Sequence, residues 1–223
     1  MIDMSTSKNL VLDLDSTAIH TNNINDLFEN IKIFHRDVHH RVAKFDIADD
    51  TNYGINLELW TIYRPYLYEF LNFCSKYFNN VFIWSAGQHK YVHIIKDLIY
   101  DKIDKKPEII YTYDDCILKG NNINKPLSKL FNDDRITNVN FKNTIVIDDR
   151  YDTFSLNPHN GILIPAYEPK DINEIKNDKD VSLLQIMGWL SLPEVKNSTD
   201  VRNLDKTNIF NITVEEYIKK IKF

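Results

Sequence analysis

The sequence has few of the residues on which several common protein classes depend. Its two cysteines, Cys74 and Cys116, make neither a disulfide framework nor a zinc site, and this frequency suits a reducing compartment. Glycine occurs only five times, and there is no internal repeat or low-complexity linker. No apolar run approaches the roughly 20 residues that a membrane span requires. The N-terminus also lacks the basic start and apolar run of a signal peptide. We therefore expect an intracellular protein, cytoplasmic or nuclear, with no membrane partner.

Positive charge is also in short supply. Lysine and arginine number 27 against 32 aspartates and glutamates, which gives a net charge of −5. Broad electrostatic binding to DNA or RNA needs clustered basic residues, so nucleic acid is not the expected partner. Apolar residues, at 43%, suffice for a sizeable core, and 223 residues suit one domain of ordinary size with a tail.

Short apolar, β-branched runs alternate with segments of helical periodicity. The runs span residues 10–14, 81–86, 144–148 and 161–166. Such runs indicate strands of a sheet that is covered on both faces. Apolar residues recur at helical spacing over 65–77, where Pro65 is well placed as the first helical residue, and over 88–100. This alternation predicts an α/β fold with a doubly wound, mostly parallel sheet, whose site lies beyond the carboxyl ends of the strands.

Two segments predict inserts in this pattern. Residues 31–61 contain a His-rich stretch, an acidic turn and then alternating residues, which together predict a β-hairpin after the first strand. Residues 108–124 predict a second hairpin, and the charged stretch 168–180 predicts a loop or a weak helix.

The last residues predict a short amphipathic helix. Thr213 and Glu216 have the spacing of a capping box. Its apolar side chains are expected to dock on the domain, with partner binding as the less favoured alternative. They are Val214, Tyr217, Ile218 and Ile221.

The segment Asp13-Leu14-Asp15-Ser16-Thr17 directly follows the first apolar run. Phosphoryl transfer needs a nucleophile, a proton donor for the leaving oxygen, and positive charge. Asp13 can attack phosphorus and form an aspartyl-phosphate, and Asp15 can act as acid and then as base. Asp pairs also cap helices, so this segment alone is modest support for such chemistry.

Three further signals follow later strands. Ser85 ends the second apolar run, where its hydroxyl suits either a phosphoryl oxygen or the N-cap of the next helix. Lys125 precedes a helix and is either a solvated charge or an ammonium beside the phosphate. The adjacent acids Asp148 and Asp149 follow a buried strand, where a Mg²⁺ ion would relieve their repulsion.

In this order, the motifs resemble those of the haloacid dehalogenase superfamily. Within it, the chain is similar to the FCP/SCP-like phosphatases of the RNA polymerase II carboxy-terminal domain. The matching pieces are DLDST (13–17), YRPYLYEFL (63–71), FIWSAGQHKYV (82–92), KPLSKL (125–130), VIDDR (146–150) and NPHNGILIPAY (157–167). The resemblance implies a phosphatase domain over residues 8–203, followed by a tail over residues 204–223.

The resemblance also implies roles for single residues. Asp13 would be the nucleophile and a Mg²⁺ ligand, and Asp15 the acid and base, with its backbone carbonyl on the metal. Asp149 would be the third protein ligand, with Asp148 beside it or reaching the metal through water. Thr17 and Ser85 would orient Asp15 and the phosphate, and Lys125 would neutralise charge. The inserts would be hairpins and not a large cap domain, which leaves the cleft open to phosphoserine or phosphothreonine in a flexible segment of a protein.

The chain departs from the family pattern at two places. Ser16 stands where the family commonly has an acidic residue. Tyr113 stands where members that act on the polymerase tail carry a basic residue, which argues against that tail as the substrate. Two rival functions stay open: a phosphatase for a nucleotide or nucleic-acid end, and an inactive module that binds phosphoproteins.

Other candidate groups are interpreted as structural. His89 and His93 have a spacing that can bind zinc, but no third ligand is evident. A basic cluster is assigned to a solvated hairpin face, and the tryptophans are assigned to the core. The cluster comprises His35, Arg36, His39, His40 and Arg41, and the tryptophans are Trp60, Trp84 and Trp189.

Overall fold

A five-stranded parallel sheet forms the centre of the protein. The computed structural model describes residues 5–23, 38–48 and 56–221. The order of the strands is β10-β9-β1-β5-β6, and each strand pairs in parallel with its neighbours. They are β1 (Asn9–Leu12), β5 (Asn80–Trp84), β6 (Ile109–Tyr111), β9 (Thr144–Asp148) and β10 (Gly161–Leu163). The predicted α/β fold with a mostly parallel sheet is therefore confirmed.

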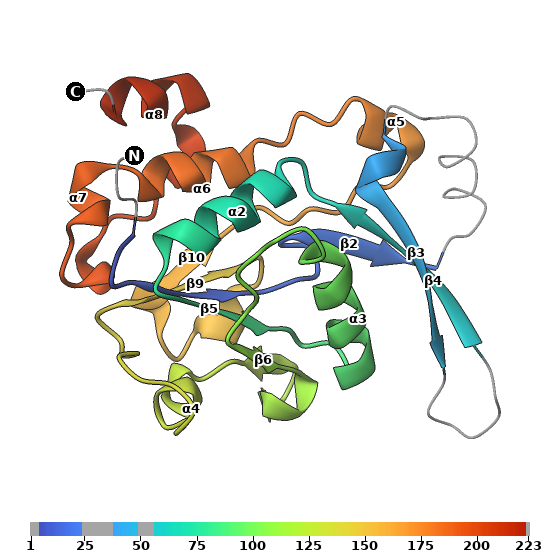
Figure 1. Ribbon diagram of the computed structural model, residues 1–223, viewed down its shortest axis with the longest axis horizontal. Helices are drawn as coiled ribbons and strands as arrows, with labels where there is room; N and C mark the ends of the chain where they lie inside the picture. The colour runs from blue at the N-terminus through green and yellow to red at the C-terminus, as the bar shows by residue number, and fades with distance from the viewer. Residues whose placement is uncertain (1–4, 24–37, 49–55, 222–223) are drawn as a thin grey trace.

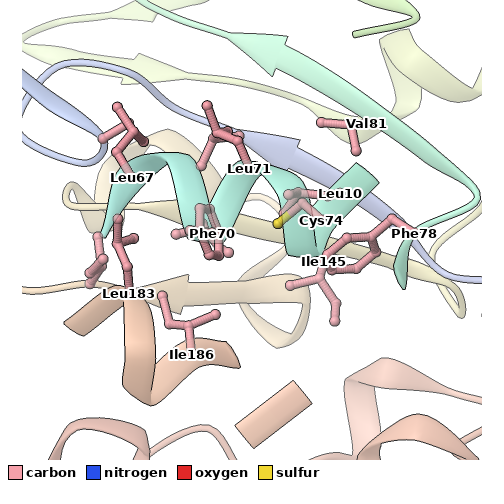
Figure 2. Close-up of a cluster of buried hydrophobic side chains, with 14 of the residues drawn as sticks. Leu10, Leu67, Phe70, Leu71, Cys74, Phe78, Val81, Ile145, Leu183 and Ile186 are labelled. Atoms are coloured by element: carbon pink, nitrogen blue, oxygen red, sulfur yellow. The ribbon is translucent and has the colours of Figure 1, made fainter. Parts of the chain in front are cut away.

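Helices cover both faces of this sheet (Figure 1). They are α2 (Leu67–Tyr77), α3 (His89–Ile99), α4 (Leu127–Phe131), α5 (Ile172–Lys176), α6 (Ser182–Leu190), α7 (Pro193–Lys196) and α8 (Val214–Ile221). Successive residues of β1 point to opposite faces: Leu10 and Leu12 belong to the larger apolar core, and Val11 to a second core. The larger core includes residues of α2, α3 and α6, and the second includes residues of α4. Figure 2 shows the larger core, where Phe70 of α2 lies near Leu183 and Ile186 of α6, and Cys74 lies near Leu10 and Ile145.

Helix α2 starts later than the sequence pattern predicts. Its first residue is Leu67, because Tyr66 has a φ of 64° and so interrupts the helical path. Pro65 therefore lies before the helix and not in its first turn, and this prediction was wrong. Helix α3, in contrast, spans nearly the predicted residues.

The first insert is a three-stranded antiparallel sheet with the order β2-β4-β3. The strands are β2 (Ile19–Asn22), β3 (Val42–Ala48) and β4 (Asn56–Tyr63). The predicted hairpin is β3 and β4, and β2, which follows the Asp13–Thr17 segment, adds a third strand. The acidic turn predicted over residues 46–53 and the His-rich stretch with His35 and Arg36 lie largely outside the described residues.

The second insert differs from the single hairpin expected over residues 108–124. Residues Ile109–Tyr111 form β6, which joins the edge of the central sheet in parallel with β5. Only the later residues form a hairpin, from β7 (Ile117–Lys119) and β8 (Asn122–Asn124). A short 3₁₀ helix, Tyr113–Asp115, connects the two parts.

Two arginines join the first insert to the segment between β10 and α6. The Arg64 side chain is fully buried and forms a bidentate pair with Asp180, at 3.1 and 2.7 Å. It also donates to the backbone oxygens of Thr17 (2.9 Å) and Pro165 (2.8 Å). Arg41 pairs with Asp178 at 2.7 Å.

The basic cluster is therefore only partly a solvated face. Arg41 pairs with Asp178, which lies between α5 and α6, so its assignment to a solvated face was wrong. His39 and His40 are exposed, as expected. The core assignment of Trp60, Trp84 and Trp189 is confirmed, because each is at most 5% exposed.

The C-terminal helix α8 docks through Tyr217, and Val214 is partly buried, while the side chain of Ile221 lies outside the described part of the chain. Tyr217 is fully buried, and its hydroxyl donates to the Ile209 backbone oxygen at 2.9 Å. Gly188 of α6 permits this contact, since a Cβ there would lie 2.6 Å from the Tyr217 side chain. The predicted capping box is confirmed by two hydrogen bonds between Thr213 and Glu216. Ile218 is 47% exposed, so its predicted docking was wrong.

The remaining predicted elements fit. Helix α5 is the weak helix expected within residues 168–180, and Asp171 caps it by accepting from two backbone amides. None of the described helices is long and apolar enough to cross a membrane. The domain division at residue 203 stays a prediction.

Candidate active site

A cleft of about 430 Å³ opens at the carboxyl ends of the central strands. Asp13 follows β1, Ser85 follows β5, and Asp148 is the last residue of β9. Parallel strands bring these ends to one edge of the sheet, so residues that are far apart in sequence meet there. Most of the predicted site residues line this cleft. They are Asp13, Asp15, Ser85, Lys125, Asp148 and Asp149.

Lys125 lies between two of these carboxylates. Its Nζ atom is 2.6 Å from Asp13 Oδ1 and 2.6 Å from Asp148 Oδ2, and all three side chains are at least 90% buried. The alternative of a solvated charge is therefore wrong. Burial lowers the pKa of Lys125, but the two carboxylates raise it by more than burial lowers it. The net shift is upward, so the group stays an ammonium. Burial raises the pKa of Asp13, and Lys125 opposes this shift.

Asp149 is held by Thr17. The Thr17 hydroxyl donates to Asp149 Oδ1 at 3.2 Å and accepts from the Asp149 backbone amide at 3.0 Å. These two hydrogen bonds join Thr17 to Asp149, whereas the resemblance implied that it orients Asp15. Burial, and then Asp148, raise the pKa of Asp149, and the bond from Thr17 opposes this.

Three carboxylate oxygens in the cleft lie close enough together to bind one metal ion. One carboxylate oxygen from each of Asp13, Asp148 and Asp149 lies within 4.8 Å of the others. Carboxylates are the preferred ligands of hard divalent cations. Four aspartates line the cleft beside the single buried ammonium of Lys125, so an anionic phosphate would need further positive charge. By donor type and by charge, the residues present fit a divalent cation.

In the described part of the chain, this is the one grouping of three such ligands. The rings of His89 and His93 lie 4.2 Å apart between centroids, and among the described residues no third ligand joins them.

Asp15 is contacted by a residue that the sequence analysis did not single out. The Tyr91 hydroxyl, from the first turn of α3, donates a short hydrogen bond to Asp15 Oδ1. Burial raises the pKa of Asp15, and this bond opposes the shift. Burial, and then the Asp15 charge, raise the pKa of Tyr91, so the phenol keeps its proton.

Ser85 has two hydrogen bonds at the floor of the cleft. It accepts from the Gly87 backbone amide at 3.0 Å and donates to Asp15. Helix α3 has Gln88 as its N-cap, so the alternative assignment of Ser85 as a cap was wrong. The segment Ser85–Gly87 lines the cleft, where its hydroxyl and backbone face the space beside Asp13.

The rim of the cleft carries charges of both signs. Arg150 forms a bidentate pair with Asp152, whose Oδ2 also accepts from the backbone amide of Ile123 in β8. Glu168 is exposed and accepts from the Ser16 hydroxyl at 3.0 Å. Glu168 lies outside the matching pieces, and Tyr91 lies within the piece 82–92 but was given no role from the sequence, so only the three-dimensional arrangement assigns them to the site.

Comparison with known proteins identifies the family. The model of the family described as "NLI interacting factor-like phosphatase" matches residues 8–202. The chain belongs to this family. The family is described as one of phosphatases. No curated protein matches the chain.

Solved structures of Fcp1 share the fold of this member of the NLI interacting factor-like phosphatase family. One is described as an essential RNA polymerase II CTD phosphatase; it has a TM-score of 0.61 and 21% identity. Another is a variant of fission yeast Fcp1 bound to beryllium fluoride, with a TM-score of 0.61 and 20% identity. The chain aligns over 96% of its own length but spans only 61% of each Fcp1 chain.

Proposed function

We propose that the chain is a Mg²⁺-dependent protein phosphatase that acts through an aspartyl-phosphate on Asp13. The observation that carries this proposal is the position of Asp13. Its carboxylate lies in the cleft, in contact with the Lys125 ammonium and beside the two other carboxylates of the three-oxygen cluster. A carboxylate held beside a cation can approach a phosphoryl group, whose negative charge would otherwise repel it.

The residues of the cleft divide the reaction between them. Asp13 attacks phosphorus, the ester P–O bond breaks, and Asp15 gives its proton to the departing oxygen. Asp15 then takes a proton from the water that attacks the aspartyl-phosphate, which releases inorganic phosphate and restores Asp13. Lys125 stays protonated throughout and offsets the negative charge of the phosphoryl oxygens. When phosphate is bound, the Ser85 hydroxyl donates its single proton to one of these oxygens in place of Asp15.

Asp13, Asp149 and the backbone carbonyl of Asp15 would hold the Mg²⁺ ion, with Asp148 beside them. When bound, the ion supplies positive charge next to the transferring phosphoryl group. Thr17 fixes the orientation of Asp149 and so supports this set of ligands.

A flexible phosphoserine or phosphothreonine segment of a protein is the substrate that this cleft suits. The described parts of the inserts are a three-stranded sheet and a short hairpin, and exposed side chains such as Glu168 form the rim. Tyr113, with the acids Asp114 and Asp115 beside it, stands where members that act on the polymerase tail resemble this chain but carry a basic residue. We therefore propose a substrate other than the polymerase tail.

The test is hydrolysis of a small aryl phosphate with and without Mg²⁺, by the unaltered chain and by the Asp13→Asn variant. We expect metal-dependent turnover that the variant lacks, and phosphate on Asp13 in mass spectra of acid-quenched protein. Asp97→Asn is the matched control, because Asp97 lies on the exposed side of α3 with 72% of its side chain accessible. Turnover that survives Asp13→Asn would rule out the assigned nucleophile.

Phosphopeptides and nucleotides then define the substrate. Faster hydrolysis of phosphoserine or phosphothreonine peptides than of nucleotides supports a protein phosphatase. The reverse order would move the assignment to a nucleotide phosphatase.

A further inference from the structure

Tyr91 connects the first insert to the reacting end of the site. Its hydroxyl donates to Asp15 Oδ1 and also lies 2.7 Å from the Thr21 hydroxyl oxygen of β2. A phenol has one proton to donate, so the Thr21 hydroxyl is the donor in the second contact. Thr21, Tyr91 and Asp15 therefore form a chain of hydrogen bonds from the insert to the carboxyl group.

Packing fixes the Tyr91 ring in this place. The ring lies against Phe45 of β3, with 6.1 Å between ring centroids. The ring also lies close to Gly87, where a Cβ would lie only 2.7 Å from it. Gly87 belongs to the segment that lines the cleft next to Ser85. A ring held between the insert and this segment has little freedom to rotate its hydroxyl away from Asp15.

We propose that Tyr91, itself held by Thr21, is a positioning residue that fixes the Asp15 carboxyl group in the orientation for proton donation to the leaving oxygen. This inference rests on the proposed function, because it assigns a role in that reaction. Tyr91 binds one carboxyl oxygen, and the other carries the proton that is transferred. As the ester P–O bond breaks, this proton moves to the leaving oxygen, and Tyr91 keeps its own.

The role predicts a dependence on the leaving group. A leaving group that is stable as an anion needs no proton donor, whereas a basic one does. Loss of the Tyr91 hydroxyl should therefore slow the cleavage of phenyl phosphate but not that of 2,4-dinitrophenyl phosphate. The ratio kcat/KM is the appropriate measure, because it reports the steps up to the phosphorylation of Asp13 and not the later hydrolysis.

The experiment compares Tyr91→Phe with the unaltered chain on these two substrates, in the presence of Mg²⁺. General acid catalysis typically contributes 10²–10⁴-fold, so we expect a loss of about ten- to a hundredfold for phenyl phosphate and less than about threefold for 2,4-dinitrophenyl phosphate. Thr21→Val keeps the shape of the side chain and removes its hydroxyl. It should give a smaller loss with the same dependence on the leaving group.

Tyr77→Phe is the control for a general effect of removing a buried phenol hydroxyl. Tyr77 donates to the Leu190 backbone oxygen at 2.7 Å, in the core between α2 and α6, and its loss should leave both ratios unchanged. An equal loss for the two substrates in Tyr91→Phe, or no loss, would overturn the positioning role while leaving the phosphatase intact. Absence of turnover in the unaltered chain would refute the proposed function and this role together.

Discussion

Replacing Lys125 by methionine tests whether this ammonium compensates the charge of the cleft. Its Nζ atom is 2.6 Å from both Asp13 and Asp148, and the three side chains are 2%, 8% and 1% exposed. Removing one partner of a buried pair typically costs about 3–5 kcal/mol, because a charge is left without compensation. Since one cation serves both carboxylates, the two contacts do not add independently. We therefore expect Lys125→Met to lower the free energy of unfolding by about 3–5 kcal/mol at neutral pH.

Urea unfolding of the two proteins measures this difference, with an unchanged dependence on urea concentration as the check for a common folded state. Lys129→Met is the matched control, because Lys129 pairs with Asp115 on the surface, where the two side chains are 42% and 26% exposed. An exposed pair contributes about 0–1 kcal/mol. Mg²⁺ should stabilise Lys125→Met more than the unaltered chain, because it supplies charge to the same carboxylates. A loss in Lys125→Met no larger than in Lys129→Met would refute the reasoning.

Three further predictions concern stability away from the cleft. Asp180→Asn leaves the fully buried Arg64 guanidinium without its carboxylate, so urea unfolding should show a loss of about 3–5 kcal/mol. Gly188→Ala places a Cβ 2.6 Å from Tyr217 and should cost about 1–3 kcal/mol, seen as a lower Tm. The Arg202 guanidinium lowers the pKa of Asp200 from 3.8 to about 2. The contribution of this carboxylate to the free energy of unfolding is therefore present above pH 4 and is lost as the pH falls through about 2. In Asp200→Asn, Tm should therefore fall less between pH 4 and about pH 2 than in the unaltered chain. An equal fall in Tm for the two proteins would contradict the assignment.

The central sheet and the positions of the main site residues follow from sequence pattern alone. Apolar runs of β1, β5 and β9 end in polar residues, and parallel strands bring such ends together. The meeting of Asp13, Ser85 and Asp148 in one cleft was therefore predictable.

Contacts between distant segments were not predictable in this way. The pairing of Arg64 with Asp180 joins residues 116 positions apart, and Tyr91 is 76 positions from Asp15. Periodicity describes which side of an element is apolar but not which residue of another element lies opposite. The strand β6 was missed for a related reason: three residues at a sheet edge carry too short a pattern to distinguish an edge strand from a hairpin.

The central position of β1 has a consequence for how the substrate range of the proposed phosphatase can change. The strand hydrogen-bonds on one side to β5 and on the other to β9, so a shift of Asp13 would disturb two ladders at once. The β7–β8 hairpin forms a two-stranded sheet separate from the central one, and its Ile117 and Leu118 are about half exposed. A change in this hairpin would therefore leave the ladders of the central sheet intact. Exchange of this hairpin is therefore a route by which relatives with the same reactive centre can diverge in the phosphorylated segments that they accept.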